Sequence, residues 1–223
     1  MARSRTLDSV LLEPEVFSLT DEAYARLLDR LVFLDIQPGA ALNDLDVSAE
    51  LGIGRTPIRS AFRRLENEGL ITTYPRRGTF ASAMDVKDLT ALNDLRRVLE
   101  PHAARRAADV CSAANREHLS ALQEEISAGV SGSNRELLAY ELGIHRAIYT
   151  AAENQYLAAT LRTLNHLAGR IWALVVAQLP DLTRSLADHI DLIGAIVAGE
   201  PDRAAQLALE HVDSFEEEVR AAL

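Results

Sequence analysis

The segment from Leu51 to Gly69 constrains the fold more than any other part of the chain, because it combines strong helix start and stop signals. It begins Leu-Gly-Ile-Gly-Arg-Thr-Pro-Ile-Arg. Thr56 suits the N-cap of a helix, and Pro57 suits the first helical position, where its missing N–H would have no partner anyway. Gly69 is placed to end this helix. Apolar and basic residues recur at helical spacing, so one face should pack inward and the other should be cationic.

A predicted hairpin follows this helix. Two short alternating runs cover residues 70–73 and 79–83, and a turn rich in Pro, Arg and Gly joins them. This pattern is typical of two antiparallel strands with a tight connection. The segment therefore predicts a two-stranded wing behind the helix.

Two further helices are expected upstream. Residues 19–36 have the apolar spacing of an amphipathic helix, which Ser18 or Thr20 can cap. Asn43 can cap a shorter helix that Gly52 ends. Helix, helix-turn-helix and wing in this order predict a winged helix-turn-helix domain.

Positive charge is concentrated in this predicted domain. Six Arg and two Glu lie between Gly54 and Phe80, a net charge of +4, whereas residues 83–223 carry 13 basic and 21 acidic groups and the whole chain carries −10. A protein that bound nucleic acid with its whole surface would be basic throughout, so DNA contact is expected on one face. For an isolated Arg-x-x-x-Arg pair, the alternative is a solvated helix face. The predicted DNA-binding residues are Arg55, Thr56, Arg59, Arg64, Arg76, Arg77 and Gly78.

These residues resemble the N-terminal domain of the GntR transcriptional regulators over roughly residues 18–82. The resemblance implies that Arg55 and Arg59 contact DNA and that Gly78, at the tip of the wing, approaches the minor groove. The motifs that carry it are Gln37-Pro38-Gly39, Leu42-Asn43, Leu51-Gly52-Ile53, Arg55-Thr56-Pro57-Ile58-Arg59, Leu65-Glu66, Gly69-Leu70 and Gly78.

Three positions depart from the family pattern. Gly54 stands where the family usually has Ser, Ser60 stands for Glu, and Leu45 stands for a DNA-contacting Arg of the second helix. The departure at Leu45 leaves the operator preference open.

The remaining chain, residues 83–223, is long enough to bury a core of its own and has no strand pattern. Abundant Ala and Leu with short connections suit an antiparallel six-helix bundle, so the whole fold is expected to be mainly α, with residues 1–17 as an N-terminal arm. Expected caps are Asp85, Asn115 and Asn134. The expected helices cover residues 86–109, 114–129, 134–152, 155–178, 182–199 and 201–222.

Ionisable side chains occupy inward positions on three of these helices. Glu141 and His145 lie four residues apart on one apolar stripe, His189 lies on a second and His211 on a third. A single such histidine is more often a hydrogen-bonded core residue than a ligand. Leaving four polar groups buried and unpaired costs about 1–3 kcal/mol each, and one shared cation would satisfy them all. Three imidazoles and a carboxylate suit Zn, ahead of Ni, Fe or Mn.

The same helices resemble the FCD ligand-binding domain of the FadR-like branch of the GntR regulators, in its six-helix VanR type. The resemblance implies a metal and a small organic-acid effector. Arg96 can pair with the effector carboxylate through its bidentate fork, or with Glu100 four residues on. The family's Asp-x-x-x-His pattern and its two later histidines fall, with Glu in place of Asp, on Glu141, His145, His189 and His211.

The sequence therefore predicts an effector-responsive repressor of a metabolic operon. It should bind a pseudo-palindromic DNA operator as a homodimer, because one recognition helix reads only a few base pairs. The alternatives are a metal-dependent hydrolase or lyase, and a regulator that senses the metal itself. No enzyme is expected, because no second inward carboxylate is identified beside the four ligands to serve as general base.

Two absences in the sequence bear on location. Cys111 is the single cysteine, which excludes an intrachain disulfide. The longest apolar run, residues 171–177, is too short to span a bilayer, so a bacterial cytoplasmic location without a membrane partner is expected.

Overall fold

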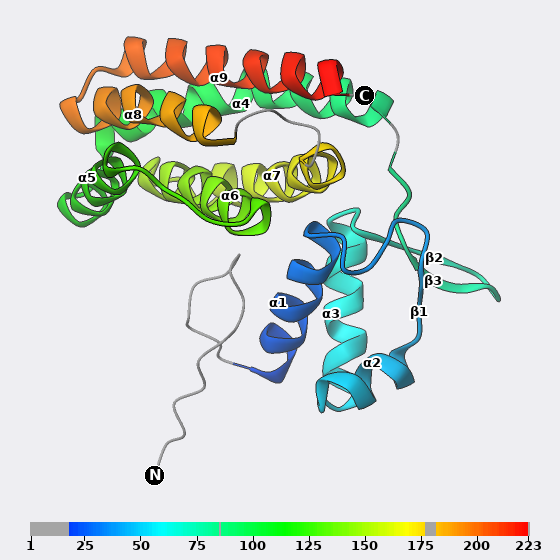
Figure 1. Cartoon of the computed structure of the whole chain (residues 1–223). Coiled ribbons are helices and arrows are strands. Elements are labelled where there is room, and N and C mark those ends of the chain that lie inside the picture. The colour runs from blue at the N-terminus through cyan, green and yellow to red at the C-terminus, as the bar shows by residue number, and fades with distance from the viewer. Residues whose placement is uncertain (1–17, 85, 177–181, 223) are drawn as a thin grey trace. The chain divides into compact units, whose positions relative to one another are not determined.

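The computed structural model describes residues 18–84, 86–176 and 182–222, and the chain divides between Met84 and Asp85 into two compact units (Figure 1). The predicted arm over residues 1–17 and the predicted cap Asp85 lie outside the described residues. Helices form most of both units, as predicted, and the described strands belong to the first unit.

Three helices form the frame of the first unit. Ser18, one of the two predicted candidates, caps the first of them through its side chain, and Asn43 caps the second as predicted. Gly52 ends the second helix with a left-handed φ of 66°, which glycine adopts without strain. The helices are α1 (Leu19–Val32), α2 (Asp44–Leu51) and α3 (Arg55–Asn67).

Apolar side chains of α1 and α3 form the core of this unit. Their spacing of three and four residues places them on one face of each helix, where they are removed from water. The side chains with no solvent exposure include Leu27, Leu28, Leu31, Ile58 and Leu65.

The start of α3 differs from the prediction that Thr56 caps this helix. The helix begins at Arg55, and Gly54 is its N-cap, without a side-chain hydrogen bond. Pro57 therefore occupies the third helical position. Proline is tolerated there because N–H groups of the first turn have no acceptor within the helix. Thr56 is an exposed residue of the first turn.

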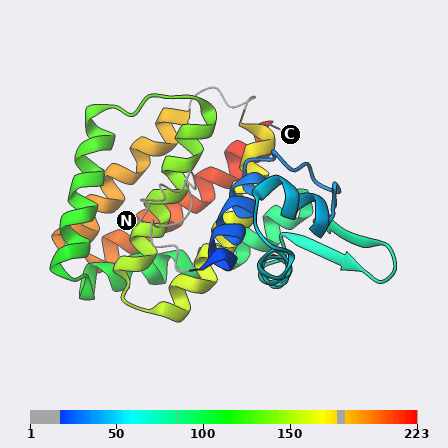
Figure 2. The ribbon, with the colours of Figure 1, turned by 90° about the horizontal axis from the view of Figure 1, so that it is seen from below.

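A three-stranded antiparallel sheet of order β1-β3-β2 completes the unit. The strands β2 (Ile71–Tyr74) and β3 (Gly78–Ala81) form the predicted hairpin, which projects beyond the helices of this unit (Figure 1, Figure 2). The strand β1 (Ala41–Leu42) pairs with β3, and Ala41 lies opposite Phe80. Two residues are too few to show the alternation that identifies a strand, so the sequence pattern does not reveal β1.

Six helices form the described part of the second unit, and their ends lie within three residues of the predicted ones. Two caps differ from the prediction. Ser112 rather than Asn115 caps the second of these six helices, and Ser133 rather than Asn134 caps the third. In both cases the serine side chain accepts the backbone N–H three residues on. The helices are α4 (Val86–Val110), α5 (Ala113–Ala128), α6 (Asn134–Ala151), α7 (Gln155–Val175), α8 (Leu182–Ala198) and α9 (Pro201–Ala222).

The long helix α4 organises this unit. It lies side by side with α9 (Figure 1) and also contacts α6, α7 and α8. The inward faces of these helices therefore meet around α4. Across the described residues, no helix is both long and apolar enough to cross a membrane.

Asn154 is the cap of α7 and offers a test of this account. Its Oδ1 accepts hydrogen bonds from the backbone N–H groups of Tyr156 and Leu157, each at 3.2 Å. Asn154→Ala removes the acceptor and should lower the free energy of unfolding by about 1 kcal/mol. Asn154→Asp keeps the acceptor and should unfold like the wild type. Urea unfolding followed by circular dichroism measures both, and equal midpoints for the two variants would contradict the role of the cap.

Candidate DNA-binding groove and metal centre

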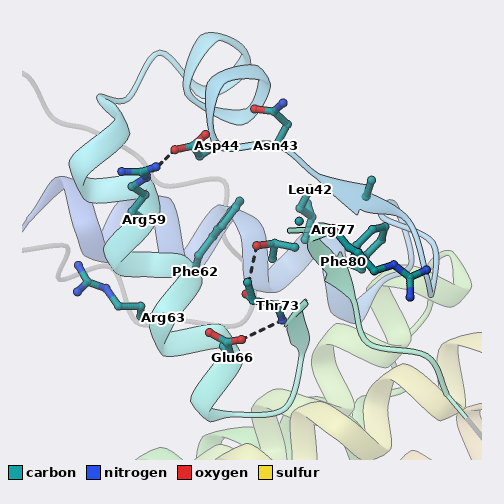
Figure 3. A pocket seen from close by; sticks show the side chains of 13 residues that line it. Leu42, Asn43, Asp44, Arg59, Phe62, Arg63, Glu66, Thr73, Arg77 and Phe80 are labelled. Atoms are coloured by element: carbon teal, nitrogen blue, oxygen red, sulfur yellow. Dashed lines mark hydrogen bonds and ion pairs between the residues drawn. The ribbon is translucent and has the colours of Figure 1, made fainter. Parts of the chain in front are cut away.

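A groove of about 690 Å³ runs between α3 and the β2–β3 hairpin (Figure 3). Glu66 Oε1 accepts the backbone N–H of Thr73 at 2.9 Å, which ties the hairpin to the helix. The two walls of the groove are therefore fixed to each other. Arg63, which was not among the predicted DNA-binding residues, lines the groove together with the predicted residues Arg59, Arg77 and Gly78.

One carboxylate at the edge of this groove joins two predicted DNA-binding arginines. Asp44, the first residue of α2, accepts hydrogen bonds through Oδ2 from Arg59 Nε at 2.6 Å and from Arg55 Nη2 at 3.0 Å (Figure 3 shows the bond to Arg59). The hydrogen bond from Arg55 lowers the pKa of Asp44, so its carboxylate is ionised at neutral pH. Sequence reasoning does not single out Asp44, because an acid in the first turn of a helix is explained by the helix dipole.

Arg64 lies on another side of α3. Its guanidinium carbon is 3.5 Å from the ring centroid of Tyr24 in α1, and its Nε donates to Glu68 at 3.3 Å. Tyr24 Oη donates to the same carboxylate at 2.6 Å. Burial, with Glu68 beside it, raises the pKa of Tyr24 well above its usual range. Arg64 thus packs α3 against α1, and its role in DNA binding stays a prediction.

The hairpin turn carries the predicted residues of the wing. The N–H of Arg77 donates to the carbonyl of Tyr74 at 3.1 Å. Arg76 and Gly78 have positive φ angles of 63° and 102°. Glycine adopts such angles freely, whereas arginine does so with strain, and strained residues cluster at functional sites. The tip presents both arginines to solvent.

The four predicted metal ligands converge in the second unit. Glu141 and His145 come from α6, His189 from α8 and His211 from α9, and all are buried. Glu141 Oε1 lies 3.5, 3.6 and 3.6 Å from the Nε2 atoms of His145, His189 and His211. One ligand atom from each residue lies within 4.8 Å of the others. The inward positions that helical spacing predicts are therefore brought together.

A second buried carboxylate stands beside this cluster, which corrects the expectation that none does. Glu100 of α4 places Oε2 3.4 Å from His145 Nδ1, and its Oε1 accepts from Arg96 Nε at 2.6 Å. Arg96 also donates Nη1–H to Asn93 at 3.2 Å. The helical spacing of residues 93, 96 and 100 is the sequence signal that places all three on one face. Arg96 pairs with Glu100 and lines the cavity beside the ligands.

Burial and neighbouring charges oppose each other in this cluster. Burial raises the pKa of Glu141, but the histidines, with His189 foremost, lower it to about 2. Burial lowers the pKa of His145, but Glu100 and then Glu141 raise it to about 9. Burial and the other histidines hold the pKa of His211 well below its usual range. In the metal-free chain at neutral pH, His145 is therefore protonated and His211 is neutral.

A small cavity adjoins the cluster. Its volume is about 10 Å³, which is room for about one water molecule. Asn165, Gly169 and Trp172 of α7 line it, and the Trp172 ring meets the edge of Phe215 with centroids 5.5 Å apart. Within the described part of the chain, Trp172 Nε1 and Glu141 Oε2 are buried without a hydrogen-bond partner. Such atoms in a native core call for a ligand, ion or water. Sequence reasoning missed Asn165 and Trp172.

The four converging residues fit a divalent transition-metal ion. Metal–ligand bonds of about 2.0–2.1 Å in a tetrahedral site place ligand atoms about 3.3–3.4 Å apart. The Nε2 atoms of His145 and His211 are 3.1 Å apart, and Glu141 Oε1 is 3.5–3.6 Å from all three Nε2 atoms. Glu100 lies beside the second ring nitrogen of His145, where carboxylates commonly orient metal-binding histidines. Glu141 reaches the histidines although it is longer than the usual Asp.

A winged helix-turn-helix joined to a helical unit around a polar cavity is the architecture of a DNA-binding regulator with a ligand-binding domain. The first unit matches the family described as bacterial regulatory proteins, gntR family, over residues 19–81, and the second matches the FCD domain over residues 91–214. The chain therefore belongs to the GntR family of transcription regulators with an FCD domain. It is a DNA-binding regulator and not an enzyme.

Known proteins of this kind are similar along most of the chain. The Nta operon transcriptional regulator of Aminobacter aminovorans is 29% identical over 192 residues, 82% of this chain and 86% of the relative. The HTH-type transcriptional repressor RspR of Escherichia coli (strain K12) is 23% identical over 91% of this chain and 89% of its own length. The solved structure of E. coli McbR/YncC has the same fold, with a TM-score of 0.80, 20% identity, and coverage of 92% of this chain and 99% of that one.

The proton on His145 makes metal uptake depend on pH. A metal-binding imidazole must be neutral, so a metal ion has to displace this proton below the His145 pKa of about 9. The apparent affinity for Zn²⁺ should rise about tenfold per pH unit between about pH 6.5 and 8.5. Competition with a chromophoric chelator measures this slope. A flat profile would show that His145 is neutral before the metal binds.

Proposed function

We propose that this chain is a homodimeric repressor of a metabolic operon that responds to a small carboxylate bound beside a divalent metal ion in the FCD domain. The observation that carries the proposal is the convergence of three imidazoles and two carboxylates beside a small cavity, which Arg96, Glu141, His145 and His211 line. RspR of E. coli, a relative over most of the chain, is named a repressor. Regulators of this family bind operator DNA, usually as dimers.

DNA binding is assigned to the exposed basic residues around the groove. With α3 in the major groove, Arg55 and Arg59 reach base edges while Thr56, at the start of the helix, faces a phosphate. Arg76 and Arg77 bind backbone phosphates, and Gly78, which has open space where a Cβ would stand, lets the wing approach the minor groove. A two-fold dimer presents two such units to two half-sites about one helical turn or less apart.

Charge balance in the second unit favours an anionic effector. In the metal-free chain, the ionised Glu100 and Glu141 balance Arg96 and the protonated His145. A divalent ion in place of the His145 proton leaves one excess positive charge in a buried site. Uncompensated buried charge is costly, so a ligand that carries one carboxylate is favoured over a neutral molecule or a cation. With four protein ligands, a bound metal would supply a Lewis-acidic position for a carboxylate oxygen only by expanding from four-coordination to five-coordination.

Two donors in the cavity wall can orient the rest of such a ligand. Arg96 uses Nε for Glu100 and Nη1 for Asn93, so Nη2 is the nitrogen through which it can reach the cavity. Trp172 Nε1–H is buried without an acceptor among the described residues. A guanidinium and an indole N–H both bind oxygen, which again fits an organic acid.

Entry of an effector must change the packing of the helices. A cavity of about 10 Å³ does not admit an organic acid unless its walls separate. These walls belong to α4, α6, α7 and α9, and α4 begins at Val86, directly after the chain leaves the DNA-binding unit. A ligand that separates them favours a second packing, and in a dimer this can change the spacing of the recognition helices.

The DNA assignment predicts the effect of removing one arginine. Arg59→Ala should weaken operator binding by about 1–3 kcal/mol and relax base preference, because a bidentate base contact is lost. Arg77→Ala should weaken binding to all sequences and lower the slope of log affinity against log salt by about 1. Fluorescence anisotropy with the duplex that the wild type selects from a random library measures both. Arg30→Ala in α1 is the control, and unchanged operator affinity in Arg59→Ala would refute the assignment.

The metal assignment predicts that the purified chain holds about one divalent ion per chain, as a site with four protein ligands would. His145→Ala or His211→Ala should lose the metal and the response to carboxylates but still bind the operator, which also shows that the variant is folded. His118→Ala, at an exposed position, should keep both. Metal analysis measures content. Trp172, the single tryptophan of the chain, lines the cavity, so its fluorescence should report carboxylate binding.

Two outcomes would overturn parts of this proposal. A metal-free preparation that keeps the full response to a carboxylate would show an organic pocket that does not need the ion. A preparation in which Zn²⁺ alone changes operator affinity, with no effect from a panel of carboxylates, would show that the metal itself is the signal.

A further inference from the structure

The carboxylate of Asp44 lies at the edge of the groove, in contact with two of the proposed DNA-binding arginines. Its Oδ2 accepts from both Arg55 and Arg59, which begin successive turns of α3. Asp44 itself is the first residue of α2 and lines the groove between helix and wing (Figure 3). One oxygen therefore links the start of α2 to the start of the recognition helix.

The exposed fractions of the three side chains show which of them DNA can contact. The side chain of Asp44 is 19% exposed, whereas those of Arg55 and Arg59 are 49% and 64% exposed. The two arginines thus cover the carboxylate while their own side chains stay open to solvent. A DNA duplex that approaches this surface would meet guanidinium groups first.

The atoms used in these bonds matter for base reading. Arg59 donates through Nε, so its two terminal nitrogens stay available for a guanine edge, which takes two parallel N–H bonds. Arg55 donates through Nη2, which leaves Nε and Nη1. An arginine without such a partner moves among many rotamers and binds any phosphate within reach. Held by Asp44, each fork has one orientation.

A negative charge at this position also opposes binding to DNA of any sequence. A carboxylate repels backbone phosphates and offsets part of the positive charge of the two arginines. It therefore weakens binding to all sequences alike. Its presence is useful to a regulator if it improves the discrimination between operator and other DNA.

We infer that Asp44 is a positioning residue that orients Arg55 and Arg59 for reading bases, so that it raises sequence preference and lowers affinity for random DNA. The inference rests on the proposed DNA contacts of these two arginines. Asp46, two residues on in the same first turn, is exposed and carries the same charge, so it is a matched control.

The experiment compares Asp44→Asn with Asp46→Asn in the purified full chain. The probes are the duplex that the wild type selects from a random library and a poly(dI-dC) competitor. Both variants lose one negative charge and should bind the competitor more tightly by similar factors. Only Asp44→Asn should lower the ratio of operator affinity to competitor affinity, by about tenfold, as expected for a weakened base contact. Asp44→Glu keeps an acceptor and should retain most of that ratio.

A double-variant cycle separates positioning from a general effect on the fold. In the Arg59→Ala background, Asp44→Asn should change the ratio less than in the wild type, because one of the two arginines that Asp44 orients is gone. Equal ratios for Asp44→Asn and Asp46→Asn, while Arg59→Ala still loses operator binding, would overturn the role of Asp44 alone. Unchanged operator binding in Arg59→Ala would instead overturn the proposed DNA contact itself.

Discussion

The second unit depends on one requirement: charges that are removed from water must neutralise one another. Glu100 and Arg96 lie on α4, and Glu141 and His145 lie on α6, so two carboxylates contact two cationic groups. His189 of α8 and His211 of α9 complete the cluster. Removing one partner of a buried pair leaves the other uncompensated, which typically costs about 3–5 kcal/mol. The positions of four helices therefore depend on the same side chains that form the candidate metal centre.

Carboxylates have a comparable role in the DNA-binding unit, where they link elements rather than balance a core. Glu66 holds the hairpin to α3, Asp44 holds α2 to α3, and Glu68 joins Tyr24 and Arg64 between α1 and α3. Each of these acids subtracts from the local positive charge. The unit thus gives up some general attraction to DNA in exchange for a defined geometry of its basic side chains, a relation that suits selective binding better than tight binding.

Much of this arrangement follows from local patterns in the sequence, and the rest depends on contacts between distant segments. Helical spacing identifies the inward positions of Glu141, His145, His189 and His211, because a period of 3.6 residues fixes a face without knowledge of the partner. The sequence presents Glu100 only as a possible partner of Arg96, because a spacing of four residues also describes an exposed ion pair, and its place beside His145 depends on how α4 packs against α6. The strand β1 is defined by its pairing with β3, nearly forty residues away, which no short window of sequence contains.

The near absence of open space beside the candidate metal centre limits how any regulator built this way can sense. The free energy needed to part the walls is subtracted from the intrinsic affinity, so the apparent dissociation constant exceeds the intrinsic one by the inverse of the open fraction. When opening precedes binding, the observed association rate levels off at the opening rate as concentration rises. So small a cavity therefore makes both the apparent affinity and the limiting association rate depend on how often its walls part.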